Sequence, residues 1–366
     1  MNEDKAARYH RLKRRVSVAS LAWSVLLLAG LVASGGHIAL RDAAVRLVPF
    51  APVFGYVLLL STISEAGGLP LAFYGGFVLE RRYGLSTQTL GAWLIDQVKS
   101  FGLGLVLGGG AASLVYWLMR LSAERWWLSA GALFAVLIVL LTNVTPVIIL
   151  PLFYSIRPLD RADLRGRLLA LAERAGARVL GAYVWGLGSK TRKANAALTG
   201  VGRTRRILVS DTMLAEYSDD EIEVVLAHEL AHHVHGDIWK GIAFESALIV
   251  AGFYLAARVL SAFAGVVGLR GVADVAGLPL LLLAAGGVSL LMVPAAHAMS
   301  RAFERSADRF ALDLTRNPSA FISAMKRLGA QNLAEERPSK LTQWLFYSHP
   351  PMRERIAAAQ AFTAKG

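Results

Sequence analysis

The sequence predicts a mainly α, polytopic membrane protein with about six transmembrane helices and one smaller α+β domain. Two observations favour this class. First, 55% of the 366 residues are hydrophobic and the mean hydropathy is +0.47, whereas soluble domains are usually about 45–50% apolar. Second, the apolar residues form separate runs, each long enough for a span of about 20 residues.

Six of these runs are predicted to cross the membrane. The second is expected to break at Gly67-Gly68-Leu69-Pro70. Its Glu65 either faces an internal space or meets lipid headgroups near the end of the span, because a carboxylate is costly in lipid. The stretch 36–48 is ambiguous. The six predicted spans are 16–34, 52–79, 101–121, 126–154, 242–263 and 278–297.

Charges in the loops predict the orientation. The basic N-terminus should be cytoplasmic, and six spans then place residues 80–100, 157–240 and 300–366 on the same side. These segments are rich in Lys and Arg. We therefore expect a multi-pass protein of an inner or plasma membrane. The net charge of +13 indicates contact with membrane lipids and no nucleic-acid partner, because no nucleic-acid-reading motif occurs.

The region 157–240 is predicted to be a soluble subdomain. Leu164, Leu168 and Leu171 repeat with a helical period. Extended stretches follow at 182–185, 195–199 and 206–210, with a hairpin turn at 200–203. Four parts are expected in all: an N-terminal transmembrane domain with about four spans at 1–156, this subdomain, a transmembrane helix pair at 241–299, and a C-terminal catalytic part at 300–366.

The strongest motif is His228-Glu229-Leu230-Ala231-His232, an H-E-x-x-H pattern. Histidines four residues apart share one helix face, about 6 Å apart along the axis, so both imidazoles can reach one ion. Glu229 then lies beside the open metal position, where it can act as general base. The chain has no cysteine, so its metal ligands must be histidines and carboxylates. One Zn²⁺ per chain is expected, in a zincin-like metalloprotease domain on the cytoplasmic side.

The helix that carries this motif has clear ends. Ser218 followed by Glu221 is a capping box at its start, and Gly236 is a plausible stop. His233 is rotated about 100° off the ligand face, and His235 lies about 10 Å along the helix from His228. Neither is expected to bind the catalytic ion.

A catalytic zinc needs a third protein ligand. Glu304 and Asp308 are four residues apart on another predicted helix. Glu304 is the candidate ligand, and Asp308 can accept a hydrogen bond from the outer nitrogen of a ligand imidazole. An ordinary solvated helix surface is the alternative that spacing alone leaves open.

These motifs resemble the integral-membrane gluzincins, which include the type I CAAX prenyl endopeptidases and the HtpX-type heat-shock proteases; the chain is closer to the first. The resemblance extends to residues 69–80, 83–89 and 151–159, to Asn195-Ala196 with Thr199-Gly200, and to Ser348-His349-Pro350-Pro351 with Arg355.

The resemblance implies roles for the matched positions. Glu304 would be the third zinc ligand, supported by Asp308. His349 would face the bound peptide and stabilise the oxyanion. Asn195 and Ala196 would lie on the edge strand that pairs with substrate, and Arg355 would contribute to substrate binding.

The predicted function is a zinc-dependent membrane endopeptidase that hydrolyses CAAX-type or other membrane-associated substrates, lipidated or not. The alternative is an HtpX-like quality-control protease for damaged membrane proteins, and Asp237 is closer to that pattern. A transporter with structural zinc is disfavoured because intramembrane charge is sparse and no fourth ligand is evident. An inactive scaffold is disfavoured because it has no need for Glu229.

Overall fold

The structure is a computed structural model that describes residues 2–200 and 204–364. Within them, six helices are long and apolar enough to cross a membrane, as predicted. The chain is mainly helical, with one small sheet, which confirms the predicted fold class. The six candidate spans are Lys5–Ala33, Pro52–Arg82, Leu90–Leu121, Trp126–Phe153, Asp237–Phe263 and Val275–Thr315.

The membrane part consists of long helices that pack through apolar and aromatic side chains. Tyr56, Tyr116 and Trp126 are among its fully buried residues. α11 packs against α6 and α12, and α3 packs against α2 and α5. The helices are α1 Asn2–Ala33, α2 Gly36–Leu47, α3 Pro52–Phe73, α4 Leu79–Arg82, α5 Leu90–Leu121, α6 Trp126–Val144, α7 Leu150–Phe153, α11 Asp237–Phe263 and α12 Leu278–Thr315, with π-helical turns η1 Tyr74–Val78 and η2 Thr145–Ile149.

The expected break in the second span is wrong. α3 continues through Pro70, and its regular pattern changes only in the π-helical turn Tyr74–Val78. The glycines there serve helix packing: a Cβ added at Gly67 would lie 2.0 Å from the Trp23 ring. The Trp23 indole also donates to the Ser64 carbonyl at 3.0 Å. Glu65 is exposed on the same helix, and the ambiguous stretch forms the 12-residue helix α2.

Two of the last spans extend beyond their predicted ends. α11 begins at Asp237, only two residues after the C-cap of the motif helix. α12 continues past residue 297 to Thr315 as one 38-residue helix. Glu304 and Asp308 therefore lie on a continuation of the sixth span, which fixes their position relative to the membrane helices.

The α+β part contains a four-stranded sheet in the order β1-β2-β4-β3. β2 is parallel to β4, and β3 is antiparallel to β4, so β3 forms one edge. The predicted turn between β3 and β4 falls at 201–203, outside the described residues. The strands are β1 Ile156–Pro158, β2 Ala182–Trp185, β3 Ala196–Thr199 and β4 Arg206–Ser210.

Helices enclose this sheet and share one apolar core with it. Leu226 and Leu230 of the motif helix, Ile207 of β4 and Phe321 of α13 are all fully buried there. The helices are α8 Ala162–Arg174, α9 Asp211–Glu216, α10 Asp219–Val234, α13 Pro318–Gln331, α14 Lys340–Phe346 and α15 Met352–Thr363. The short 3₁₀ turn η4, Val275–Gly277, belongs to the membrane part and directly precedes α12.

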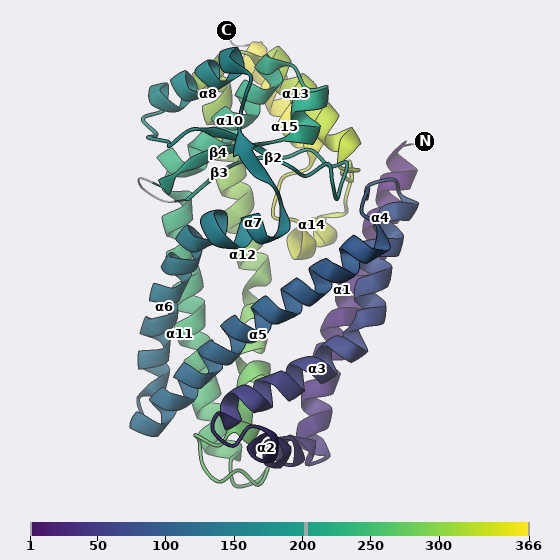
Figure 1. Ribbon diagram of the computed structural model, residues 1–366. Coiled ribbons are helices and arrows are strands. Elements are labelled where there is room, and N and C mark those ends of the chain that lie inside the picture. Colours follow the sequence, from purple (N-terminus) through teal and green to yellow (C-terminus); the bar gives the residue numbers. More distant parts are fainter. Residues whose placement is uncertain (1, 201–203, 365–366) are drawn as a thin grey trace.

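Figure 1 shows the sheet, α10, α13 and α15 at one end of the molecule, with α2 at the opposite end. The N-terminus of α1 lies toward the same end as the sheet. Figure 1 also places α4 toward this end, so each of the three basic segments has at least one element there.

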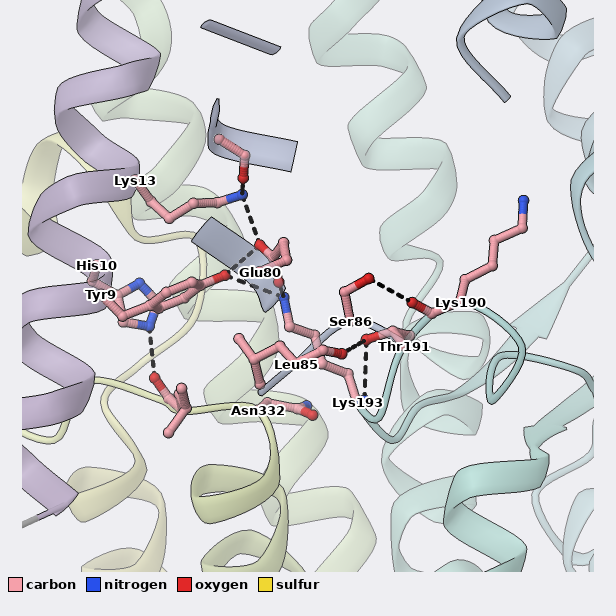
Figure 2. A network of polar contacts seen from close by, with 12 residues as sticks. Tyr9, His10, Lys13, Glu80, Leu85, Ser86, Lys190, Thr191, Lys193 and Asn332 are labelled. Carbon is pink, nitrogen blue, oxygen red and sulfur yellow. Dashed lines mark hydrogen bonds and ion pairs between the residues drawn. The ribbon is translucent and has the colours of Figure 1, made fainter. Parts of the chain in front are cut away.

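A polar network ties the membrane helices to the segment that leads into β3 (Figure 2). The Glu80 carboxylate accepts hydrogen bonds from Tyr9 Oη at 2.6 Å, Lys13 Nζ at 2.8 Å and Lys193 Nζ at 3.1 Å. Nearby, the backbone N–H of Arg192 donates to the Leu85 carbonyl at 2.8 Å. The network holds the start of the edge strand against α1 and α4.

Candidate active site

The motif helix α10 is fixed at both ends as its sequence predicts. Ser218 and Glu221 form the reciprocal capping box. Gly236 ends the helix with a φ of 68°, a left-handed conformation that glycine adopts without a Cβ penalty. Ser323 and Arg327 of α13 also donate to the Glu221 carboxylate, at 2.5 and 3.0 Å. This end of α10 is thereby held on the C-terminal part of the chain.

His228, His232 and Glu304 come together at the crossing of α10 and α12. One ligand atom from each lies within 4.8 Å of the others. Nε2 of His228 is 3.2 Å from Glu304 Oε2, and Nε2 of His232 is 3.5 Å from Glu304 Oε1. Two imidazole nitrogens and a carboxylate facing one point form a donor set that suits Zn²⁺.

The state of the Glu304 carboxylate supports this fit. Its Oε2 atom is buried, and no described residue gives it a well-directed hydrogen bond, although Nε2 of His228 and Nδ1 of His349 lie 3.2 and 2.8 Å away. A buried carboxylate oxygen without a directed donor is costly. A cation shared with the two imidazoles removes that cost, so these three residues are suited to hold the metal.

The outer nitrogen of His228 faces a buried ion pair. Nδ1 lies 2.9 Å from Asp308 Oδ1, and Arg355 donates to both Asp308 oxygens at 2.8 and 2.5 Å. Burial alone lowers the pKa of His228, but the neighbouring carboxylates of Asp308 and Glu304 outweigh it and raise the pKa to about 9. Asp308 thus fixes the orientation of this imidazole.

The outer nitrogen of His232 has its own carboxylate. Nδ1 lies 3.1 Å from Asp237 Oδ2, and Lys240 Nζ lies 3.1 Å from Asp237 Oδ1. From the sequence, Asp237 was noted only because its position is closer to the HtpX-type pattern, and no contact with His232 was predicted. Its place five residues after His232, at the first residue of α11, is the signal that could have indicated this contact.

Glu229 and His349 line the same cavity as the candidate ligands His228 and Glu304. This cavity has a volume of about 360 Å³ and also contains Asn195 and Ala196. Burial raises the pKa of Glu229, which makes its carboxylate a stronger proton acceptor. The His349 side chain is 60% exposed, and its Nδ1 lies 2.8 Å from Glu304. It can therefore reach a peptide that enters the cavity.

Asn195 and Ala196 stand where the edge strand borders this cavity. Asn195 is exposed, and its backbone N–H and carbonyl are bonded to Ser210 at the end of β4. Successive residues of a strand direct their backbone groups to opposite sides, so the N–H and carbonyl of Ala196 face the free edge. An extended peptide could pair there.

Three further histidine and arginine positions need comment. Arg355 is buried, and its guanidinium pairs with the Asp308 carboxylate. Its direct contact is therefore with the residue that orients His228. His233 and His235 are outside the candidate metal group among the described residues. His235 instead lies 3.3 Å from the Ser306 hydroxyl.

Sequence reasoning missed the contacts that frame the cavity. The Glu80 network and Asn332, which is bonded to the backbone of Ala194, join positions separated by 67 to 138 residues. No local pattern carries such contacts. The one available signal was the predicted edge strand itself, because alternate residues of an edge strand direct backbone groups away from the sheet, where they need partners.

A motif helix with two imidazoles and a glutamate, a third ligand, Glu304, on α12 and an open strand edge define a zinc metallopeptidase, here built on membrane helices. Comparison with protein families agrees. Residues 158–363 match the model of peptidase family M48, and residues 2–155 match a model described as CAAX prenyl protease N-terminal, five membrane helices. The chain belongs to peptidase family M48.

Individual relatives give the same result. The chain is 33% identical over 315 residues to the uncharacterized metalloprotease YhfN of Bacillus subtilis, covering 85% of this chain and 74% of the relative. It is 27% identical over 310 residues to the CAAX prenyl protease 1 homolog of Oryza sativa, covering 82% and 72%. The crystal structure of Ste24p from S. mikatae superposes with a TM-score of 0.87 at 25% identity, over 98% of this chain and 88% of that one.

These findings establish the main function predicted from the sequence. The protein is an integral-membrane, zinc-dependent endopeptidase. One difference from the matched N-terminal family model is visible: four of the six candidate spans lie within residues 2–155, and α2 is an additional short helix there.

Proposed function

We propose that this enzyme cleaves CAAX-type, lipidated peptide substrates near their C-terminus, on the cytoplasmic side of an inner or plasma membrane. The observation that carries the proposal is one cavity in which Glu229, the metal ligands His228 and Glu304 and the free edge of β3 meet, at the end of the membrane helices. Relatives named as CAAX prenyl proteases over most of the chain support the substrate class.

The roles of the residues follow from their positions. His228, His232 and Glu304 hold one zinc ion, which supplies Lewis acidity at the scissile carbonyl. Asp308 and Asp237 keep the two imidazoles in the tautomer that presents Nε2. Arg355 holds Asp308 charged and in place.

Glu229 is the proton carrier of the reaction. It takes one proton from the attacking water while the remaining hydroxyl adds to the acyl carbon, and it then delivers that proton to the leaving nitrogen as the C–N bond breaks. His349 donates toward the oxygen on which negative charge develops, a contact of a kind worth about 3–4 kcal/mol. Asn195 and Ala196 hold the extended substrate on the edge of β3.

A second cavity supports a substrate with an apolar tail. It has a volume of about 430 Å³ among α3, α5, α6, α11 and α12. Most of its lining is aliphatic or aromatic, and Ser289 of α12 is one of its few polar lining residues. α12 carries Glu304 15 residues beyond Ser289, about 22 Å along the helix axis. A lipid tail in the bundle and a peptide at the metal are therefore compatible.

The test compares a farnesylated CAAX peptide, the same peptide without lipid and an unfolded membrane protein, using purified enzyme with and without a chelator. We expect cleavage of the farnesylated peptide that the chelator abolishes. Glu229→Gln should retain zinc and lose about 10²–10⁴-fold in turnover. Full activity of the zinc-loaded Glu229→Gln enzyme would refute the assigned base. Preferential cleavage of the unfolded membrane protein would support quality control instead.

A further inference from the structure

The edge that β3 leaves free is already closed two residues before the strand begins. The backbone N–H of Ala194 donates to Asn332 Oδ1 at 3.1 Å, and Asn332 Nδ2 donates to the Ala194 carbonyl at 3.2 Å. One side-chain amide therefore satisfies both backbone groups of the residue at the N-terminal end of the edge. Asn332 lies beside this lead-in segment in Figure 2.

The hydrogen-bond pattern of the strand shows what Asn332 replaces. Asn195 directs its N–H and carbonyl toward β4, where they bond to Ser210 Oγ at 3.0 Å and the Ser210 N–H at 2.9 Å. Backbone direction alternates along a strand, so Ala194 and Ala196 both face outward. The two bonds between Asn332 and Ala194 are those that a residue of an added antiparallel strand would make with Ala194. Ala196 is the first outward position left for a substrate.

We infer that Asn332 closes the substrate-binding edge and restricts the enzyme to short C-terminal leaving peptides; this inference rests on the proposed function. A substrate that pairs antiparallel to β3 directs its C-terminal end toward Ala194. The substrate residue opposite Ala196 can bond, the next one points away, and the following one meets Asn332. The leaving peptide must therefore end, or turn away from the edge, about two residues beyond the residue that pairs with Ala196.

The loop that presents Asn332 is held in an unfavourable conformation. Asn332 is the C-cap of α13, and the next residue, Leu333, has a φ of 50° at a position that usually holds glycine. The Ala334 N–H bonds back to the Gly329 carbonyl at 2.8 Å, as in a Schellman motif. A leucine persists in this conformation only where its surroundings require it.

Those surroundings belong to the N-terminal helix. His10 Nε2 donates to the Leu333 carbonyl at 2.8 Å, and Leu333 packs against a cluster that contains Tyr9 and Tyr83. Arg14 pairs with Glu335 at 2.6 Å just beyond. Contacts with α1 therefore hold the loop that carries Asn332 in place at the closed end of the edge.

The neighbouring residue offers a matched control. Gln331 also braces this loop, because its Nε2 donates to the Arg192 carbonyl at 2.8 Å and its Oε1 accepts from Tyr217 at 2.9 Å. Neither contact involves an outward backbone group at Ala194 or Ala196. Gln331→Ala thus loosens the loop and leaves the end of the edge closed.

The experiment uses farnesylated peptides that are identical up to the cleaved bond and carry leaving peptides of about three, six and nine residues. For the zinc-loaded wild-type enzyme, kcat/KM should fall on the order of tenfold from the shortest to the longest, mainly through KM. Asn332→Ala should reduce this ratio below about threefold by improving the long substrates, and Gln331→Ala should retain the wild-type ratio. Mass spectrometry of the released peptides identifies the bond cleaved.

Each outcome decides the inference. Equal wild-type rates for all lengths, or an unchanged ratio in Asn332→Ala, would overturn it and leave the proposed function intact. Failure of the zinc-loaded wild-type enzyme to cleave any of these peptides would overturn both. Should Asn332→Ala not fold, Asn332→Asp retains the size and the bond from the Ala194 N–H but cannot donate to its carbonyl, and it should show a smaller shift in the same direction.

Discussion

The two histidines of the metal site are oriented by very different surroundings. His228 is buried, and its partner Asp308 is held by Arg355, whose side chain is 7% exposed. These three residues come from α10, α12 and α15. His232 is more open, and its partner Asp237 is the first residue of α11, directly after the turn that follows the motif helix. Lys240, which completes this second group, has a side chain that is 54% exposed.

The difference predicts that the ion pair beside His228 contributes strongly to the stability of the fold, whereas the ion pair beside His232 contributes little to it. A buried charge that loses its partner is uncompensated, at a cost of about 3–5 kcal/mol. An exposed ion pair is worth about 0–1 kcal/mol because water screens it. The His228 side therefore joins three distant elements and forms only when the whole domain folds. The contacts of His232 with Asp237, and of Asp237 with Lys240, form between residues that are at most eight positions apart in the sequence.

The largest effect is expected for Arg355→Ala. It leaves the Asp308 carboxylate buried without its bidentate partner and should lower the free energy of unfolding by about 3–5 kcal/mol. Thermal unfolding in detergent measures this loss. The control is Arg305→Ala, which removes an exposed pair with Glu354 on the same two helices and should cost less than about 1 kcal/mol. Equal losses of stability in the two variants would contradict the expected difference between a buried and an exposed ion pair.

The next effect separates the two supporting carboxylates. Asp308→Asn should weaken zinc binding by about 10–100-fold, as expected for the partner of a metal-bound imidazole. Asp237→Asn should fall at the lower end of that range, because His232 is more accessible to water. Competition with a fluorescent zinc chelator measures both affinities. A larger loss in Asp237→Asn would reverse the comparison.

A smaller effect is expected from pH in the chelated protein. The pKa of His228 is raised from 6.5 to about 9, so protonated His228 stabilises the metal-free fold fully below about pH 6.5. This contribution is lost as the pH rises toward about 9. The unfolding temperature of chelated enzyme should therefore fall over this interval, and Asp308→Asn should flatten the fall. An increase with pH over the same interval would contradict the assigned contacts.

The smallest effect is expected for Lys240→Ala. Its ammonium pairs with Asp237 from the surface, so zinc affinity should change by less than about threefold and stability by less than about 1 kcal/mol. The same chelator competition checks it. A loss as large as that of Arg355→Ala would show that the exposed side also depends on a structural ion pair.

Local patterns predicted much of this molecule. The motif helix, its capping box and the edge strand depend on residues within a few positions of each other, and hydropathy gave all six spans. The break at Pro70 was wrong because Trp23, far away in the sequence, packs on Gly67 and supports a continuous helix. The partner of Arg355 and the position of Asn332 could not be predicted either, because both depend on how distant helices meet.

The most direct test of the central claim is the zinc content per chain of the wild-type enzyme and of His228→Ala, His232→Ala and Glu304→Ala, measured by metal analysis after dialysis against a weak chelator. The wild-type enzyme should hold one zinc per chain, and each variant should lose most of it. A full complement of zinc in Glu304→Ala would contradict a metal site shared between α10 and α12.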